Sequence, residues 1–149
     1  MPSARHSLVK WLAASVWYVG AGMLIWKGSG WLIQAARTAP LWPILLAAVA
    51  LAIGLLRGRT TFRKAVIRNL RRIRELDSPR PWHVFRPWFF LAFVGMGVLA
   101  MLMGHLARTG YWGEVVVGSL DLVIGISLFT GAAAHWTWRP DPARRPDRR

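Results

Sequence analysis

Four long apolar runs separated by basic segments constrain this chain more than any other feature. A helix that crosses the ~30 Å hydrocarbon core of a bilayer needs about 20 mostly apolar residues. Runs of this kind cover residues 8–26, 40–56, 87–106 and 115–138. A helix satisfies its own backbone hydrogen bonds in lipid, and no run shows the alternation typical of barrel strands. The sequence therefore predicts an all-α fold: an integral membrane four-helix bundle in a single domain over 1–138. The run 40–56 is the shortest, and a re-entrant segment remains an alternative there.

The basic residues are distributed very unevenly between the two ends of the expected bundle. Of the 20 Lys and Arg residues, 17 lie in the first ten residues, in 57–86 or in the tail 139–149. The other three, Lys27, Arg37 and Arg108, lie in the loops expected at the opposite end. Basic residues in short loops mark the cytoplasmic side of a membrane protein. We therefore expect a multi-pass protein of the bacterial cytoplasmic (inner) membrane with both termini in the cytoplasm. This rule already explains the net charge of +14, so nucleic acid is not an expected partner. The tail is rich in Pro and Arg and is expected to be disordered.

The connection between the second and third runs is expected to contain a basic amphipathic helix over 61–76. Apolar residues recur at spacings of three and four: Phe62, Val66, Leu70, Ile73 and Leu76. Basic residues fill most of the remaining surface: Arg63, Lys64, Arg68, Arg71, Arg72 and Arg74. Such a helix can lie on the lipid bilayer and contact anionic phospholipids through these side chains. Alternatively, it extends the second run and packs against its own bundle.

Ionisable residues inside a membrane are costly, and they mark candidate functional sites. The candidates are Asp121, His105, Glu114 and Lys27. Asp121 shares a helical face with Gly118 and Gly125, and small residues favour close helix packing in lipid, so Asp121 should face protein. Gly97 and Gly104 are expected to pack helices in the same way. His105 is the expected neighbour of Asp121, while Lys27 or Arg108 could also reach it. Asp121 could fix helix packing, relay protons or cations, or bind a ligand.

Motifs for metal, phosphate or nucleophilic chemistry are missing from the sequence. The chain has no cysteine, and its histidines lack the spacing typical of a metal site. We therefore expect no metal site, no cofactor and no enzymatic activity. A tetrapyrrole bound to His105 or His135 remains an alternative, because a neutral imidazole is a good axial ligand.

The segment 62–131 resembles an uncharacterised family of small four-span bacterial membrane proteins. The residues that carry the resemblance are Arg68, Arg71, Arg72, Ile73 and Leu76, followed by the Gly-rich runs. The resemblance implies a four-helix architecture and no activity.

Two functions fit these features. The first is a non-catalytic accessory or scaffold subunit of a larger membrane complex, in contact with other membrane subunits or with a second copy of itself. The alternative is a small oligomeric transporter of ions, protons or solutes that uses Asp121 and His105.

Overall fold

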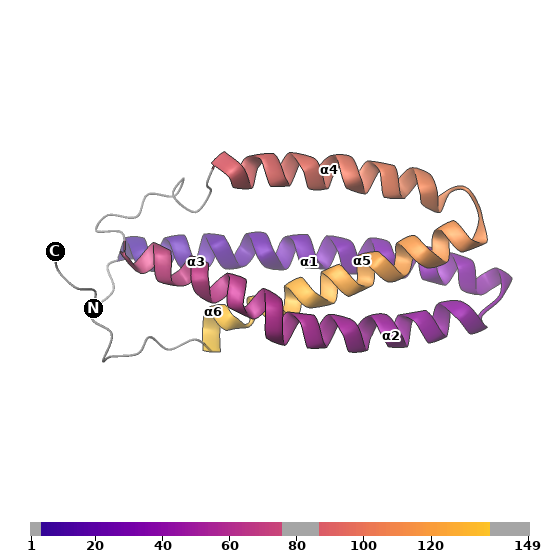
Figure 1. Ribbon diagram of the computed structural model, residues 1–149, viewed down its shortest axis with the longest axis horizontal. Coiled ribbons are helices and arrows are strands. Elements are labelled where there is room, and N and C mark those ends of the chain that lie inside the picture. Colours follow the sequence, from indigo (N-terminus) through magenta and orange to yellow (C-terminus); the bar gives the residue numbers. More distant parts are fainter. Residues whose placement is uncertain (1–3, 76–86, 138–149) are drawn as a thin grey trace.

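The computed structural model describes residues 4–75 and 87–137, which form helices and short turns and contain no strand. Side chains are described for 11–71, 95 and 98–137. The helices run lengthwise along the molecule (Figure 1). Their bounds are α1 Ala4–Thr38, α2 Leu41–Arg57, the π-helix η1 Gly58–Phe62, α3 Arg63–Glu75, α4 Pro87–Ala107, α5 Tyr111–Ala132 and α6 Ala134–Thr137. The predicted all-α fold is confirmed for these residues, while the predicted disordered tail 139–149 lies outside them.

Helix α1 is much longer than the apolar run 8–26 from which it was predicted. It spans 35 residues and ends at Thr38, shortly before Pro40. A residue that precedes proline disfavours the helical region, which explains the end of the helix. The polar residues after Trp26 do not break the helix, because Leu32 and Ala35 continue its buried face. Lys27 therefore lies inside a helix, and the expected loop at this position is a wrong prediction.

Helices α2, η1 and α3 follow one another without an intervening loop. Two residues of the apolar stripe are buried within the protein: Val66 and Leu70 form a cluster with Ala134, against which Trp17 and Ile67 pack. This arrangement matches the second alternative for 61–76, an extension of the second run that packs against its own bundle. Val66 and Leu70 are consequently not free to insert into a leaflet, whereas the side chains of Ile73 and Leu76 lie outside the described residues.

Helix α5 occupies the centre of the bundle and makes its most extensive contact with α1. Small buried residues recur every seven positions on both helices: Ala14, Ala21, Gly28 and Ala35 on α1, and Gly118, Gly125 and Ala132 on α5. We call these residues the small-residue seam. A methyl group added at Gly28 would lie 2.8 Å from the Gly118 carbonyl oxygen, and one added at Gly125 would lie 2.8 Å from Ile25 Cγ1. The two helix backbones can approach this closely only because the seam lacks larger side chains.

Helix α2 packs on another side of α5 through a second set of small residues. Ala50, Gly54 and Gly58 are buried and follow one another at intervals of four. A methyl group at Gly54 would lie 2.8 Å from Ile126 Cβ, and one at Gly58 would lie 2.6 Å from Thr130 Cβ. This is the small-xxx-small pattern of packed membrane helices.

Helix α4 packs far less tightly than the other long helices. Its described side chains from Val98 to Leu106 are all exposed or partly exposed, and Met101 is 79% exposed. Gly104 was expected to pack helices, but a methyl group there would meet no described atom within 4 Å. The prediction is therefore wrong for Gly104, and Gly97 lies outside the described side chains.

Two helices are long and apolar enough to cross a membrane in the part of the chain with described side chains. They are Leu41–Arg71 and Tyr111–Thr137, whose most apolar 18-residue windows have mean hydropathies of 2.0 and 1.9. A shorter apolar helix covers Val98–Ala107.

Candidate functional site

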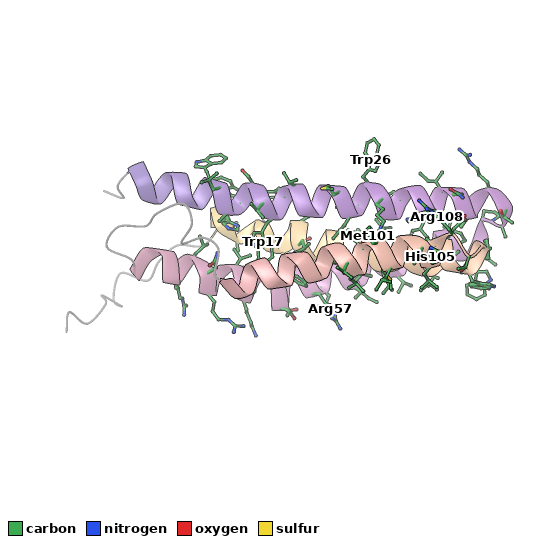
Figure 2. All side chains as sticks on the ribbon, turned by 90° about the horizontal axis from the view of Figure 1, so that it is seen from above. Trp17, Trp26, Arg57, Met101, His105 and Arg108 are labelled. Atoms are coloured by element: carbon green, nitrogen blue, oxygen red, sulfur yellow. The ribbon has the colours of Figure 1, made fainter. Side chains whose placement is uncertain are left out.

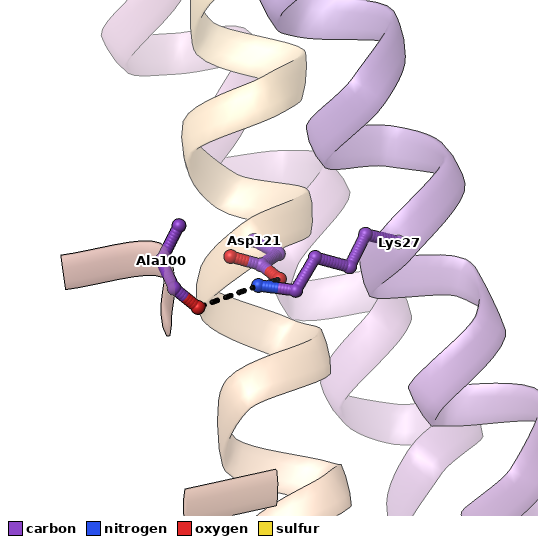
Figure 3. Close-up of polar contacts among 3 residues, drawn as sticks. All are labelled: Lys27, Ala100 and Asp121. Carbon is purple, nitrogen blue, oxygen red and sulfur yellow. Dashed lines mark hydrogen bonds and ion pairs between the residues drawn. The ribbon is translucent and has the colours of Figure 1, made fainter. Parts of the chain in front are cut away.

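Three helices meet at an ion pair between Lys27 of α1 and Asp121 of α5. The Lys27 Nζ lies 3.3 Å from Asp121 Oδ2 and donates a hydrogen bond of 3.3 Å to the carbonyl oxygen of Ala100 on α4 (Figure 3). Asp121 is only 6% exposed, whereas the Lys27 side chain is 31% exposed. The carboxylate is therefore shielded, and the ammonium group links all three helices.

The small-residue seam explains how the sequence brings this pair together. Lys27 directly precedes Gly28, and a methyl group at Gly28 would lie 2.9 Å from Asp121 Cβ. The close approach of α1 and α5 at Gly28 and Gly118 therefore places the base of Asp121 against α1. The flexible Lys27 side chain needs only to fold over the carboxylate.

The pair lies halfway along α5. Asp121 is ten residues beyond Tyr111, the first residue of the helix, which corresponds to ~15 Å at 1.5 Å per residue. This distance equals half the thickness of a ~30 Å hydrocarbon core. The apolar run predicted from the sequence begins only at Val115 and consequently places Asp121 closer to one end.

His105 is not the partner of Asp121. It is exposed on α4, five residues beyond Ala100, or ~7.5 Å along the helix. Figure 2 shows His105 towards the end of the molecule that also carries Arg108. No polar contact joins His105 or Arg108 to Asp121 among the described residues. The prediction of His105 as the neighbour was therefore wrong, and Lys27, one of the two other candidates, takes its place.

Glu114 forms a second polar contact between the same two helices. Gln34 Nε2 donates a hydrogen bond of 2.6 Å to Glu114 Oε1. Gln34 follows Lys27 by seven residues, and Asp121 follows Glu114 by seven, so the two contacts share one side of the α1–α5 interface. Prediction from the sequence missed Gln34 because a loop is expected there.

The described residues contain no group of three or more His, Cys, Asp or Glu side chains that could hold a metal ion. His135 is 1% exposed, and its Nδ1 lies 2.9 Å from the Ala132 carbonyl oxygen. The His135 ring is therefore enclosed by the protein, and the tetrapyrrole alternative stays a prediction. His105 is exposed.

A groove of about 470 Å³ opens between α1 and α4 beside the ion pair. Its lining is apolar apart from Lys27: Gly22, Met23, Leu24, Trp26, Lys27 and Ala100. The Trp26 side chain is 85% exposed and points away from the bundle (Figure 2). The Lys27 side chain therefore borders an otherwise apolar surface.

The basic residues proposed for lipid contact lie on the exposed side of α3. Arg63, Lys64, Arg68 and Arg71 are all exposed, and none forms an ion pair with another described residue. The side chains of Arg72 and Arg74 lie outside the described residues.

Two repeats of small residues in the sequence indicate the helix faces that pack around this site, and hydropathy alone does not reveal them. One is the seven-residue repeat of Ala14, Ala21, Gly28 and Ala35, which continues past Trp26. The other is the four-residue repeat of Ala50, Gly54 and Gly58. The first repeat indicates both the length of α1 and the face that carries Gly28 next to Lys27.

Comparisons with known proteins identify no relative for this chain. No family model, curated protein or solved structure matches it. The resemblance to a four-span family therefore remains an expectation, and the function must be argued from the helices themselves.

Proposed function

We propose that the chain is a four-span integral membrane protein in which α1, α2, α4 and α5 cross the bilayer. Each of these helices has 17 or more residues. The surface supports this proposal, since large apolar side chains such as Trp26 and Met101 are exposed. The interior contains mainly small residues, as in packed membrane helices.

Aromatic residues near both ends of the bundle support the same placement. At one end, the rings of Trp42 and Trp112 lie 6.0 Å apart, and the Tyr111 hydroxyl donates to the Ala39 carbonyl oxygen at 3.0 Å. At the other end, the rings of Trp11 and Trp136 lie 4.5 Å apart. Trp and Tyr favour the interfaces of a membrane. With the basic α3 at the second end, the positive-inside rule places that end and both termini in the bacterial cytoplasm.

The role that best fits this architecture is a non-catalytic accessory or scaffold subunit of a larger membrane complex. The observation that carries this proposal is the pairing of Asp121 with Lys27 inside the α1–α5 interface. A shielded carboxylate bound to a neighbouring ammonium group holds helices together and is poorly placed for acid–base chemistry. Removing one partner of a buried pair typically costs about 3–5 kcal/mol, because the other charge is left unpaired.

Contact with anionic lipid headgroups forms the second part of the proposal. The exposed side chains of Arg63, Lys64, Arg68 and Arg71 provide it, at about 1 kcal/mol for each residue near the surface. Because Val66 and Leu70 are buried, the contact is electrostatic and should weaken strongly with salt.

Native mass measurement of the protein extracted gently from its own membrane tests the scaffold role. A scaffold predicts extraction with other subunits in fixed stoichiometry. Extraction as a lone monomer with neither partner nor lipid contradicts it.

The second candidate function is an oligomeric transporter for ions, protons or solutes. The partial exposure of the Lys27 side chain favours it, because one partner of the ion pair is not fully shielded. Transport predicts that Asp121→Asn abolishes flux in reconstituted vesicles while the helical content is retained. The scaffold role predicts no flux with either the unmodified protein or the Asp121→Asn variant.

A further inference from the structure

We propose that a cationic patch at the junction of α2, η1 and α3 selects phospholipids whose headgroup carries two phosphates. This inference rests on the proposed contact with anionic lipid and deepens it. The cationic patch consists of five exposed side chains that lie close together in the sequence: Arg57, Arg59, Arg63, Lys64 and Arg68. None of them forms an ion pair among the described side chains.

The described carboxylates, Asp121 and Glu114, lie too far away to neutralise the cationic patch. Gly131 of α5 packs against η1, since a methyl group added there would lie 2.6 Å from Phe62 Cβ. Asp121 lies ten residues before Gly131 on α5, or ~15 Å along the helix, and Glu114 lies further still. This distance exceeds the Debye length of about 8 Å at physiological ionic strength. The described part of the protein therefore leaves the patch without a counter-charge.

The cationic patch lies at the level of the lipid headgroups in the proposed four-span arrangement. Helix α5 is 22 residues long, or ~33 Å, and therefore crosses the ~30 Å hydrocarbon core from end to end. Gly58 packs against the last turns of α5, since a methyl group added there would lie 2.6 Å from Thr130 Cβ. The π-helix η1 consequently marks the cytoplasmic edge of the hydrocarbon core, where a headgroup layer of about 5–8 Å begins.

Basic side chains from both sides of η1 converge on this headgroup layer. Arg63 and Lys64 are the first two residues of α3 and lie within the layer. Arg57 lies just before η1, and Arg68 lies six residues, or ~9 Å, beyond the end of η1. Both have long side chains that can place their charged ends in the headgroup layer. Because the opposite side of α3 is buried in the bundle, the charges of the patch crowd around the exposed half of one helix.

This density of charge determines the class of lipid. A helix is only about 10–12 Å wide, so few headgroups can lie side by side along its exposed half. Cations four residues apart, such as Lys64 and Arg68, also repel each other. A lipid with one phosphate brings one negative charge in each headgroup and leaves part of the patch unneutralised. A lipid with two phosphates brings two charges, and its second phosphate binds at a high effective concentration once the first is bound.

The lipids retained by the full-length protein in nanodiscs test this proposal. The discs contain zwitterionic phospholipid with either phosphatidylglycerol, which has one phosphate, or cardiolipin, which has two, at equal total negative charge. Native mass spectrometry counts the lipids that stay bound to each chain. We expect a preference of at least about tenfold for cardiolipin, and high salt should release it.

Two double variants with the same change of charge separate the cationic patch from the net charge of the protein. Arg63→Gln with Lys64→Gln removes two cations from the patch, and the affinity for cardiolipin should fall about 30-fold, as expected for two basic residues near a membrane surface. Arg37→Gln with Arg108→Gln is the matched control, because it removes two exposed cations at the opposite end of the bundle. The control should retain cardiolipin like the unmodified protein, and circular dichroism checks that both variants keep their helices.

Equal losses of cardiolipin in the two double variants overturn the proposal. In protein extracted from its own membrane, an acidic protein or a nucleic acid bound to α3 in place of lipid overturns it as well. Equal retention of phosphatidylglycerol and cardiolipin rejects only the selection of two phosphates. Retention of neither lipid also rejects the proposed contact with anionic lipid.

Discussion

The α1–α5 interface and helix α4 show two different outcomes for glycine-containing apolar helices. At the small-residue seam, a methyl group added at Gly28 of α1 or at Gly118 or Gly125 of α5 would come within 3 Å of the opposite helix. On α4, a methyl group added at Gly95 or Gly104 would meet no described atom within 4 Å. Hydrophobic burial does not drive helices together in lipid, so close van der Waals contact must do so. A glycine contributes to that contact only where another helix lies directly against it, as α5 does against Gly28 of α1.

The ion pair sharpens this difference, because it lies on the tight interface and contacts α4 through only one hydrogen bond to a carbonyl oxygen. Mutations on the α1–α5 side should therefore affect the free energy of unfolding strongly, and mutations on α4 weakly.

The largest effect is expected from breaking the ion pair on one side only. Asp121→Leu leaves the Lys27 ammonium unpaired midway along the bundle, and we expect the free energy of unfolding to fall by about 3–5 kcal/mol. Denaturation in mixed lipid–detergent bicelles, followed by circular dichroism, measures this change.

The double variant Lys27→Met with Asp121→Leu is its control. It removes both charges, and its stability should lie within about 1 kcal/mol of the unmodified protein or exceed it. Equal losses in the single and double variants would show that the pair does not hold the helices together.

A smaller loss is expected when the small-residue seam is overfilled. Gly28→Ala places a methyl group 2.8 Å from the Gly118 carbonyl oxygen, so the helices must separate, at a cost of about 1–3 kcal/mol. Gly30→Ala is a matched control on the same helix, since Gly30 has open space among the described residues. The control should be neutral or gain up to about 1 kcal/mol in helix propensity. Similar losses in both variants would argue against the seam.

The Gln34–Glu114 contact at the same interface should contribute less. Gln34→Ala removes the 2.6 Å hydrogen bond, but Gln34 is exposed, and we expect a loss of about 1 kcal/mol in the same bicelle measurement. Gln34→Glu should cost more than Gln34→Ala, because it places two carboxylates opposite one another. The hydrogen bond is irrelevant to stability if the two variants match the unmodified protein.

The sequence predicted the helices and the packed face of α5 well, and it predicted the partner of Asp121 poorly. Apolar runs identify helices because length and composition suffice, and Gly118 and Gly125 placed Asp121 on a protein-facing side. The residue that pairs with Asp121 depends on the axial register and rotation of α1 against α5. The predicted order and orientation of the helices do not determine either of these. Hydropathy also predicted that the first helix ends at Trp26, which is too early. Lys27, Gly28 and Gln34 are typical of a loop, and only their contacts with α5 explain why they lie in a helix.

The smallest effect is expected on α4, and it provides the most direct test of the contrast with α5. Gly104→Ala adds a methyl group where no described atom lies within 4 Å, so only helix propensity should change, with a gain of up to about 1 kcal/mol. The bicelle measurement used for Gly28→Ala allows a direct comparison. A loss above about 1 kcal/mol would mean that α4 is closely packed in the membrane, against another helix of this chain or of a partner. In that case α4 would be loosely packed only in the isolated chain. The glycines of α4 would then lie in a contact that forms when the protein assembles in the membrane.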